Sequence, residues 1–169
     1  CFPASLSPQA GLLLHALVLN MRPRVVVETG SFLGASTLWI GGAIEESAKL
    51  KAQSSNQDGR TGPLSSLVAC APSLHCFDDF GPIKPGPWRP EGFEGDRLSV
   101  VRERLGRAGL AESVTLHRGD SATELVRSRD ALKKLGGVDL AFLDGDHTVE
   151  GATRDLWAVE PVLNTGGYV

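Results

Sequence analysis

The stretch that decides the fold is Val25–Thr37, which reads Val-Val-Val-Glu-Thr-Gly-Ser-Phe-Leu-Gly-Ala-Ser-Thr. It begins with three consecutive β-branched residues, a pattern typical of a central parallel strand that is covered on both faces. Gly30 then permits a sharp turn without a Cβ clash. The residues after it predict a helix, whose first free N–H groups favour a carboxylate or a phosphate. The stretch therefore predicts a ligand site between a strand and a helix.

The spacing within this turn separates two kinds of ligand. A dinucleotide-binding turn has the pattern Gly-x-Gly-x-x-Gly, in which the second glycine lets a pyrophosphate approach. Here the pattern is Glu28-x-Gly30-x-x-x-Gly34-x-Ser36, so that glycine is missing. The acid two positions before the first glycine suits an ammonium group, which S-adenosylmethionine carries in its amino-acid part. For the turn taken alone, a tight turn without any ligand remains the alternative.

Strands and helices alternate outward from this turn. The alternation predicts one α/β domain over residues 1–169, with a doubly wound, mostly parallel sheet. A polar stretch within 53–73 predicts a flexible insertion, and the proline-rich segment 81–95 predicts a loop over one end of the sheet. The expected strands are 24–28, 74–77, 114–117 and 138–143, and the expected helices are 7–21, 33–51, 96–109, 121–135 and 149–163.

The composition of the chain limits the kinds of binding partner that we expect. The net charge of −3 leaves no basic surplus for a phosphate backbone, so we expect a small molecule rather than nucleic acid. Three cysteines without metal-ligand spacing favour reduced thiols and a cytoplasmic setting. The apolar run 11–18 is too short to span a bilayer, which predicts no membrane partner. The sequence starts without methionine and stops inside an apparent strand, so we expect a fragment that lacks the last strands.

Polar residues follow three of the predicted strands, at the sheet edge where parallel α/β folds bind ligands. Asp78 comes directly after the second strand, and a carboxylate there suits a ribose diol; a strand-terminating aspartate without a ligand is the alternative. Gly119-Asp120-Ser121 follows the third strand. This triplet suits an adenine edge, although capping of the next helix by Asp120 or Ser121 is the simpler interpretation.

The fourth strand is followed by Asp144-Gly145-Asp146-His147. Two carboxylates and an imidazole within four residues suit a divalent cation and a general base. Capping of the next helix by Asp146, together with a structural role for His147, is the alternative.

Taken together, these motifs resemble the class I S-adenosylmethionine-dependent methyltransferases, and in particular the cation-dependent O-methyltransferases of the catechol and macrocin types. The similarity runs over nearly the whole chain. The resemblance implies a Rossmann-like methyltransferase fold and methyl transfer to a hydroxyl of a small molecule. It implies magnesium at Asp144 and a base at His147. The cofactor contacts that it implies are Glu28, Gly30, Ser31, Gly34, Ser36, Asp78, Gly119, Asp120 and Ser121.

Two rival functions stay open at this point. A nicotinamide-dependent oxidoreductase is disfavoured by the missing glycine and by the lack of a Tyr-x-x-x-Lys pair. A non-catalytic domain that keeps the methyltransferase fold is the other. The resemblance places the remaining magnesium ligands after the strand that begins near Gly167, beyond Val169. The acceptor and the oligomeric state are not indicated.

Overall fold

A computed structural model of the chain describes residues 6–57, 71–83 and 95–169. Its five strands form one parallel sheet in the order β3-β2-β1-β4-β5, in which β1 is central and β3 is an edge strand. This confirms the doubly wound α/β fold. The strands are β1 Val25–Thr29, β2 Ser73–Asp78, β3 Val114–Arg118, β4 Val138–Leu143 and β5 Leu163–Tyr168.

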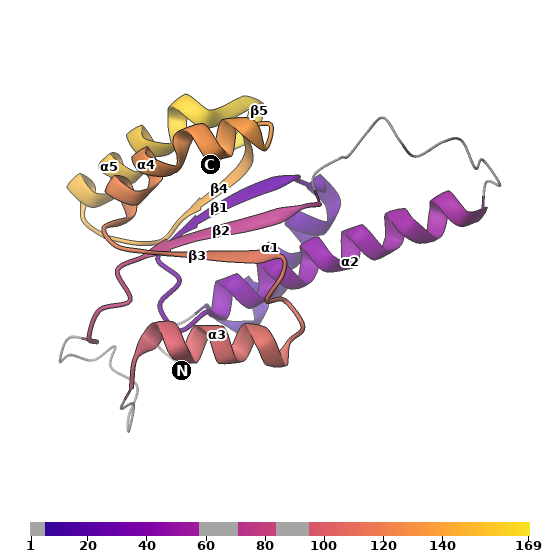
Figure 1. Cartoon of the computed structure of the whole chain (residues 1–169), viewed down its shortest axis with the longest axis horizontal. Coiled ribbons are helices and arrows are strands. Elements are labelled where there is room, and N and C mark those ends of the chain that lie inside the picture. Colours follow the sequence, from indigo (N-terminus) through magenta and orange to yellow (C-terminus); the bar gives the residue numbers. More distant parts are fainter. Residues whose placement is uncertain (1–5, 58–70, 84–94) are drawn as a thin grey trace.

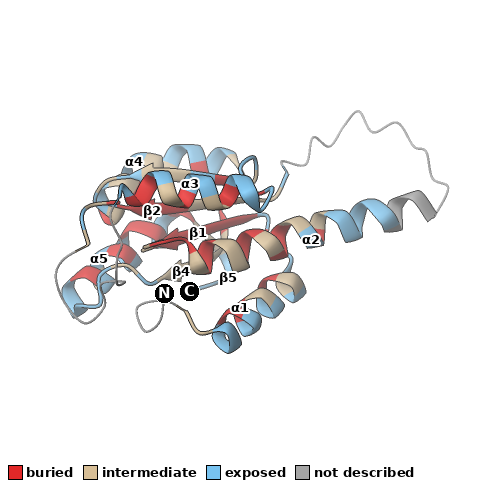
Figure 2. Cartoon of the chain, turned by 90° about the horizontal axis from the view of Figure 1, so that it is seen from below, coloured by how far each residue is buried: buried red, intermediate tan, exposed pale blue. Residues whose placement is uncertain are grey.

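The helices cover both faces of the sheet, as Figure 1 shows. On one face lie α1 Pro8–Met21, α2 Ala35–Gln57 and α3 Arg97–Arg107, and on the other lie α4 Ser121–Lys134 and α5 Val149–Val159. Figure 2 shows buried residues along the inner sides of the helices and exposed residues along their outer sides, and α1 packs mainly against α2. The single turn η1, Glu160–Val162, joins α5 to β5.

The core consists of two apolar clusters that meet at β1. Val26 packs into the cluster under α1, α2 and α3, whereas Val25 and Val27 pack into the cluster under α4 and α5. This division follows from the alternation of side chains along a strand. All five residues of β1 are buried, which confirms the interpretation of the three valines as a central strand.

Two predicted helix ends differ from the structure by more than two residues. Helix α2 continues to Gln57, six residues past its predicted end at Lys51, because the added residues, Ala-Gln-Ser-Ser-Asn-Gln, include no glycine or proline to end it. Residues 53–57 of the predicted 53–73 insertion therefore belong to α2, and Ser73 belongs to β2. Helix α5 ends at Val159 instead of Leu163, because Pro161 has no N–H to continue the helix. Residues 58–70 and 84–94, which hold most of the predicted insertion and loop, lie outside the described residues.

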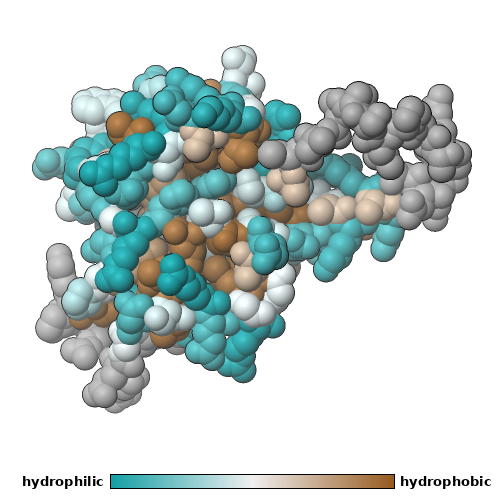
Figure 3. Space-filling view, viewed as in Figure 1, coloured by the Kyte–Doolittle hydropathy of each residue, from teal (hydrophilic) through white to brown (hydrophobic). Residues whose placement is uncertain are grey.

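The face that carries the edge strand is mixed in polarity. Figure 3 shows apolar side chains between β3 and α3, with hydrophilic side chains around them. Within the described ranges, no helix has both the length and the hydropathy that a bilayer crossing requires.

Candidate functional site

Glu28 is the centre of a buried cluster below the turn between β1 and α2. Its side chain is 0 % exposed. The carboxylate accepts hydrogen bonds from the hydroxyls of Thr37 (2.7 Å), Ser31 (3.4 Å) and Ser36, and from the thiol of Cys76 on β2 (3.0 Å). Three of these donors belong to the turn and the first turn of α2. Glu28 therefore fixes how the helix leaves the strand.

The electrostatics of this cluster follow from burial. Desolvation raises the pKa of Glu28, and the four side-chain donors oppose that rise. Burial also raises the pKa of the Cys76 thiol well above its usual value, and the neighbouring Glu28 adds to the increase. Cys76 is therefore a protonated donor to the carboxylate. The predicted contact between Glu28 and an amino group stays a prediction, and the contacts seen here are all internal.

Asp78, at the end of β2, ties the turn after β1 to the loop after β2. One carboxylate oxygen accepts the Phe32 N–H (2.9 Å), and the other accepts the Phe80 N–H (2.6 Å). Both phenylalanines have left-handed backbones, with φ of 49° and 47°. Burial raises the pKa of Asp78, while the Phe80 N–H and the Arg97 guanidinium oppose this.

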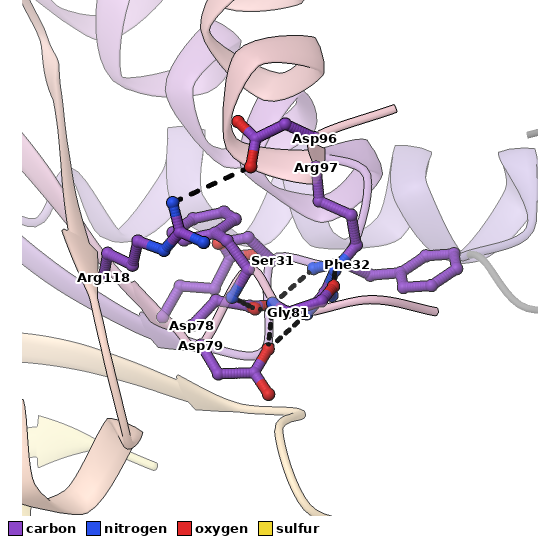
Figure 4. A network of polar contacts seen from close by, with 10 residues as sticks. Ser31, Phe32, Asp78, Asp79, Gly81, Asp96, Arg97 and Arg118 are labelled. Atoms are coloured by element: carbon purple, nitrogen blue, oxygen red, sulfur yellow. Dashed lines mark hydrogen bonds and ion pairs between the residues drawn. The ribbon is translucent and has the colours of Figure 1, made fainter. Parts of the chain in front are cut away.

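Arg97, the first residue of α3, completes this network (Figure 4). Its guanidinium donates to an Asp78 oxygen (3.0 Å), to Asp79 and to the Gly81 carbonyl (2.6 Å), and it lies 5.8 Å from the centre of the Phe32 ring. The sequence analysis missed this residue. An arginine that follows an N-cap residue has no distinctive spacing, so nothing in the pattern indicated it.

The segment after β3 meets the same network. The Gly119 N–H donates to the Asp78 carbonyl (3.0 Å), which ties the two strand ends together. Asp120 is the N-cap of α4 and accepts from the Thr123 N–H (3.0 Å) and from the Thr123 hydroxyl (2.5 Å). That hydroxyl bond is the main cause of the lowered pKa of Asp120. The capping interpretation of Asp120 is confirmed, and its contact with an adenine stays a prediction.

The loop after β4 presents Asp144 and His147 toward solvent. The imidazole Nδ1 lies 3.9 Å from an Asp144 oxygen, and the side chains are 82 % and 46 % exposed for His147 and Asp144. Burial raises the pKa of Asp144, and His147 partly offsets this. Asp146 instead accepts the Thr148 N–H (2.9 Å), and Thr148, not Asp146, is the N-cap of α5.

A cavity of about 250 Å³ lies against this loop. It is lined by residues 143–149, Ala152 and Asp155. Asp155 lies on the buried face of α5 and is 2 % exposed; its carboxylate accepts the Ser121 hydroxyl at 2.6 Å. The sequence analysis missed this residue as well. The signal was an acid on the same helical face as Gly151, Ala158 and Val159.

The two strongest sequence motifs are in backbone contact. The Asp144 N–H donates to the Thr29 carbonyl at 2.9 Å. Gly30 has a φ of 83°, and a Cβ built on it would overlap the carbonyl group of Asp144 and the Cα of Gly145. Only glycine therefore allows the turn after β1 and the loop after β4 to lie so close. The predicted cofactor turn and the predicted base loop are neighbours.

A metal site does not follow from these neighbours. Within residues 6–57, 71–83 and 95–169, no group of three or more histidine, cysteine, aspartate or glutamate side chains is arranged to hold a metal ion. Magnesium at Asp144 stays a prediction from the resemblance.

Comparison with protein families matches residues 27–169 to a model described as a methyltransferase domain. No curated protein matches the chain significantly. Solved structures do match. A methyltransferase from Geobacter sulfurreducens has a TM-score of 0.62 and 19% identity, and the match covers 98% of this chain and 63% of that one.

Two O-methyltransferase structures give similar values. TomG from Streptomyces achromogenes, which is involved in tomaymycin synthesis and was solved with S-adenosylmethionine, has a TM-score of 0.58 and 21% identity over 97% of this chain and 55% of its own. The Bacillus cereus enzyme, in complex with S-adenosylhomocysteine, has a TM-score of 0.56 and 17% identity over 96% and 55%. At these identities the likeness shows the fold. The chain spans about half to two thirds of the length of these structures.

Proposed function

The chain belongs to the methyltransferase domain family, and on that basis we propose that it transfers a methyl group from S-adenosylmethionine to a hydroxyl oxygen of a small molecule. The observation that carries the proposal is the backbone contact between the turn at Gly30 and the loop at Asp144. A methyl donor held at the first would lie beside a base on the second. Such proximity supplies much of the catalysis of a displacement reaction.

The polar groups of the sheet edge fit this cofactor. The start of α2 offers a positive helix end to its carboxylate. Asp78 offers carboxylate oxygens to a ribose hydroxyl, which would share them with the Phe32 and Phe80 N–H groups. Glu28 acts through Ser31 and Ser36, whose positions it fixes. We place the adenine along Gly119, Asp120 and Ser121.

The proposed mechanism needs little from the protein beyond alignment and proton removal. When bound, S-adenosylmethionine supplies a methyl group activated by a sulfonium. His147 Nε2 takes the proton of the acceptor hydroxyl, while Asp144 orients the imidazole through Nδ1. The separation of 3.9 Å must shorten for this, as catalytic contacts often do when substrate binds. No step depends on magnesium.

Calorimetry with the 169-residue chain tests whether it binds the proposed cofactor. We expect saturable binding of S-adenosylmethionine and S-adenosylhomocysteine and no binding of NADH. Binding of NADH alone would overturn the proposal and restore the oxidoreductase.

Substitution of the base tests the chemistry. We expect His147→Gln to lower kcat for methyl transfer to a panel of hydroxylated acceptors, beginning with catechol, by about 10²–10⁴-fold. Asp146→Asn is the matched control, because its amide oxygen keeps the hydrogen bond to the Thr148 N–H.

Binding of S-adenosylmethionine without transfer to any acceptor would favour the non-catalytic domain. Activity with added magnesium and with a chelator tests the predicted ion.

A further inference from the structure

One buried acid close to the proposed cofactor site has no role in the mechanism above. Asp155 is 2 % exposed on the inner face of α5, and within the described part of the chain it takes part in no ion pair. One of its carboxylate oxygens accepts the Ser121 hydroxyl at 2.6 Å. A buried carboxyl group is costly unless its hydrogen bonds compensate, so the arrangement requires an explanation.

The other Asp155 oxygen lies beside Gly145, just after the end of β4. A Cβ built on Gly145 would lie 3.2 Å from that oxygen and 3.4 Å from the Thr29 hydroxyl. Among the described residues, this hydroxyl is the buried side-chain group that lacks a hydrogen-bond partner. Asp155 also lines the cavity of about 250 Å³ beside the loop after β4. It therefore lies where β1, β4 and the start of α4 meet.

In the hydrogen bond between Ser121 and Asp155, the serine hydroxyl is the donor, and this determines what else Ser121 can bind. The Ser121 hydroxyl donates its single proton to an Asp155 carboxyl oxygen at 2.6 Å. The Ser121 hydroxyl oxygen can then only accept a hydrogen bond from any other partner. A group that contacts this oxygen must donate.

We infer that Asp155 is a positioning residue that makes Ser121 an obligate acceptor and thereby selects a nucleobase with an amino group. The inference rests on the proposed function, which places the base of the cofactor beside Gly119, Asp120 and Ser121. We place position 6 of the base at Ser121, where adenine carries an amino donor and hypoxanthine carries a carbonyl acceptor. Two acceptors that face each other leave both unsatisfied, and the discrimination against hypoxanthine is about tenfold or more.

The test compares two product analogues, S-adenosylhomocysteine and S-inosylhomocysteine, by calorimetry on the 169-residue chain. We expect the wild-type protein to bind the adenine form at least about tenfold more tightly. In Asp155→Leu the Ser121 hydroxyl is free to rotate and donate, so the ratio falls to about threefold or less. Ser121→Ala, which removes the acceptor, gives the same fall without a change in the buried acid. Asp155→Ala replaces the leucine variant if thermal melting shows that the latter is unfolded.

Asp130→Asn, an exposed change on α4, is the control and keeps the wild-type ratio. The outcomes separate the two proposals. Failure of the wild-type protein to bind either analogue overturns the proposed function and this inference together. If the wild-type protein binds S-adenosylhomocysteine and S-inosylhomocysteine about equally tightly, this inference alone is overturned. The same holds if Ser121→Ala lowers the ratio while the folded Asp155 variants keep it.

Discussion

Phe32 and Phe80 adopt a backbone conformation that side chains rarely accept, with φ of 49° and 47°. For a residue other than glycine, asparagine or aspartate this costs about 1–2 kcal/mol. Both N–H groups donate to Asp78, so one buried carboxylate stabilises both strained residues. Strain of this kind gathers at functional sites, and here it lies in the two loops on either side of the proposed ribose position.

We expect Asp78→Asn to lower the free energy of unfolding by about 1–3 kcal/mol, because an amide NH₂ would face one of these two N–H donors. The charge beside Arg97 would also be lost. Urea denaturation measures the effect. The matched control is Asp79→Asn, whose side chain is 68 % exposed and whose bond to Arg97 contributes little at the surface. Equal losses in the two variants would contradict this account of Asp78.

At the scale of the elements, α3 and α4 begin in the same way. Asp96 caps α3 and accepts from the Ser99 N–H and hydroxyl, each at 2.8 Å. Asp120 caps α4 with the corresponding pair from Thr123. Each also has an arginine partner, Arg118 at 3.7 Å for Asp96 and Arg154 at 2.9 Å for Asp120. The two caps are therefore a natural matched pair, of which only Asp120 lies in the segment proposed to meet the adenine.

We expect Asp96→Ala and Asp120→Ala each to lower the free energy of unfolding by about 1 kcal/mol through loss of the cap. In addition, Asp120→Ala weakens S-adenosylhomocysteine binding, whereas Asp96→Ala leaves it near the wild-type value. Thermal melts and calorimetry measure the two effects. Unchanged binding in Asp120→Ala would leave that residue with capping as its whole role.

At the scale of the whole molecule, half-buried His75 and buried Glu28 make stability depend on pH in opposite directions. Burial, aided by the neighbouring His117, lowers the pKa of His75 to about 4. Between about pH 6.5 and 4 the unfolded chain therefore binds a proton that the folded chain refuses, and stability falls as pH falls. Burial raises the pKa of Glu28, so its contribution is fully present below 4.5 and is lost as pH rises through the folded pKa.

We expect His75→Gln to flatten the loss of stability between pH 6.5 and 4 by about 1–2 kcal/mol, after allowance for partial exposure of the ring. His117, whose pKa burial also lowers, accounts for part of the slope that remains. Urea denaturation at a series of pH values measures the change. A variant curve parallel to that of the wild type would contradict the lowered pKa of His75.

Much of this molecule could be predicted from local pattern. The structure confirmed the predictions for the β1 valines, the glycine turn and the alternation of strands and helices. Each of these features is determined by residues that are close in sequence. The helix boundary at Pro161 was missed because the apolar period continues across it. Arg97 and Asp155 were missed because their roles come from contacts with residues distant in sequence, with Asp78 in one case and Ser121 in the other. The predicted cofactor contacts and the base remain proposals.

The close approach of Gly30 to Asp144 has a consequence for how such a site can diverge. Under the proposed function, side chains that line the site can change, and the identity of the acceptor can change with them. The spacing between the proposed donor and acceptor positions is set by two backbones that touch. A methyl group at Gly30 would act as a wedge and widen that spacing while leaving every polar group in place. Under the proposed function, acceptor specificity can therefore change while the distance between the methyl donor and the acceptor stays constant.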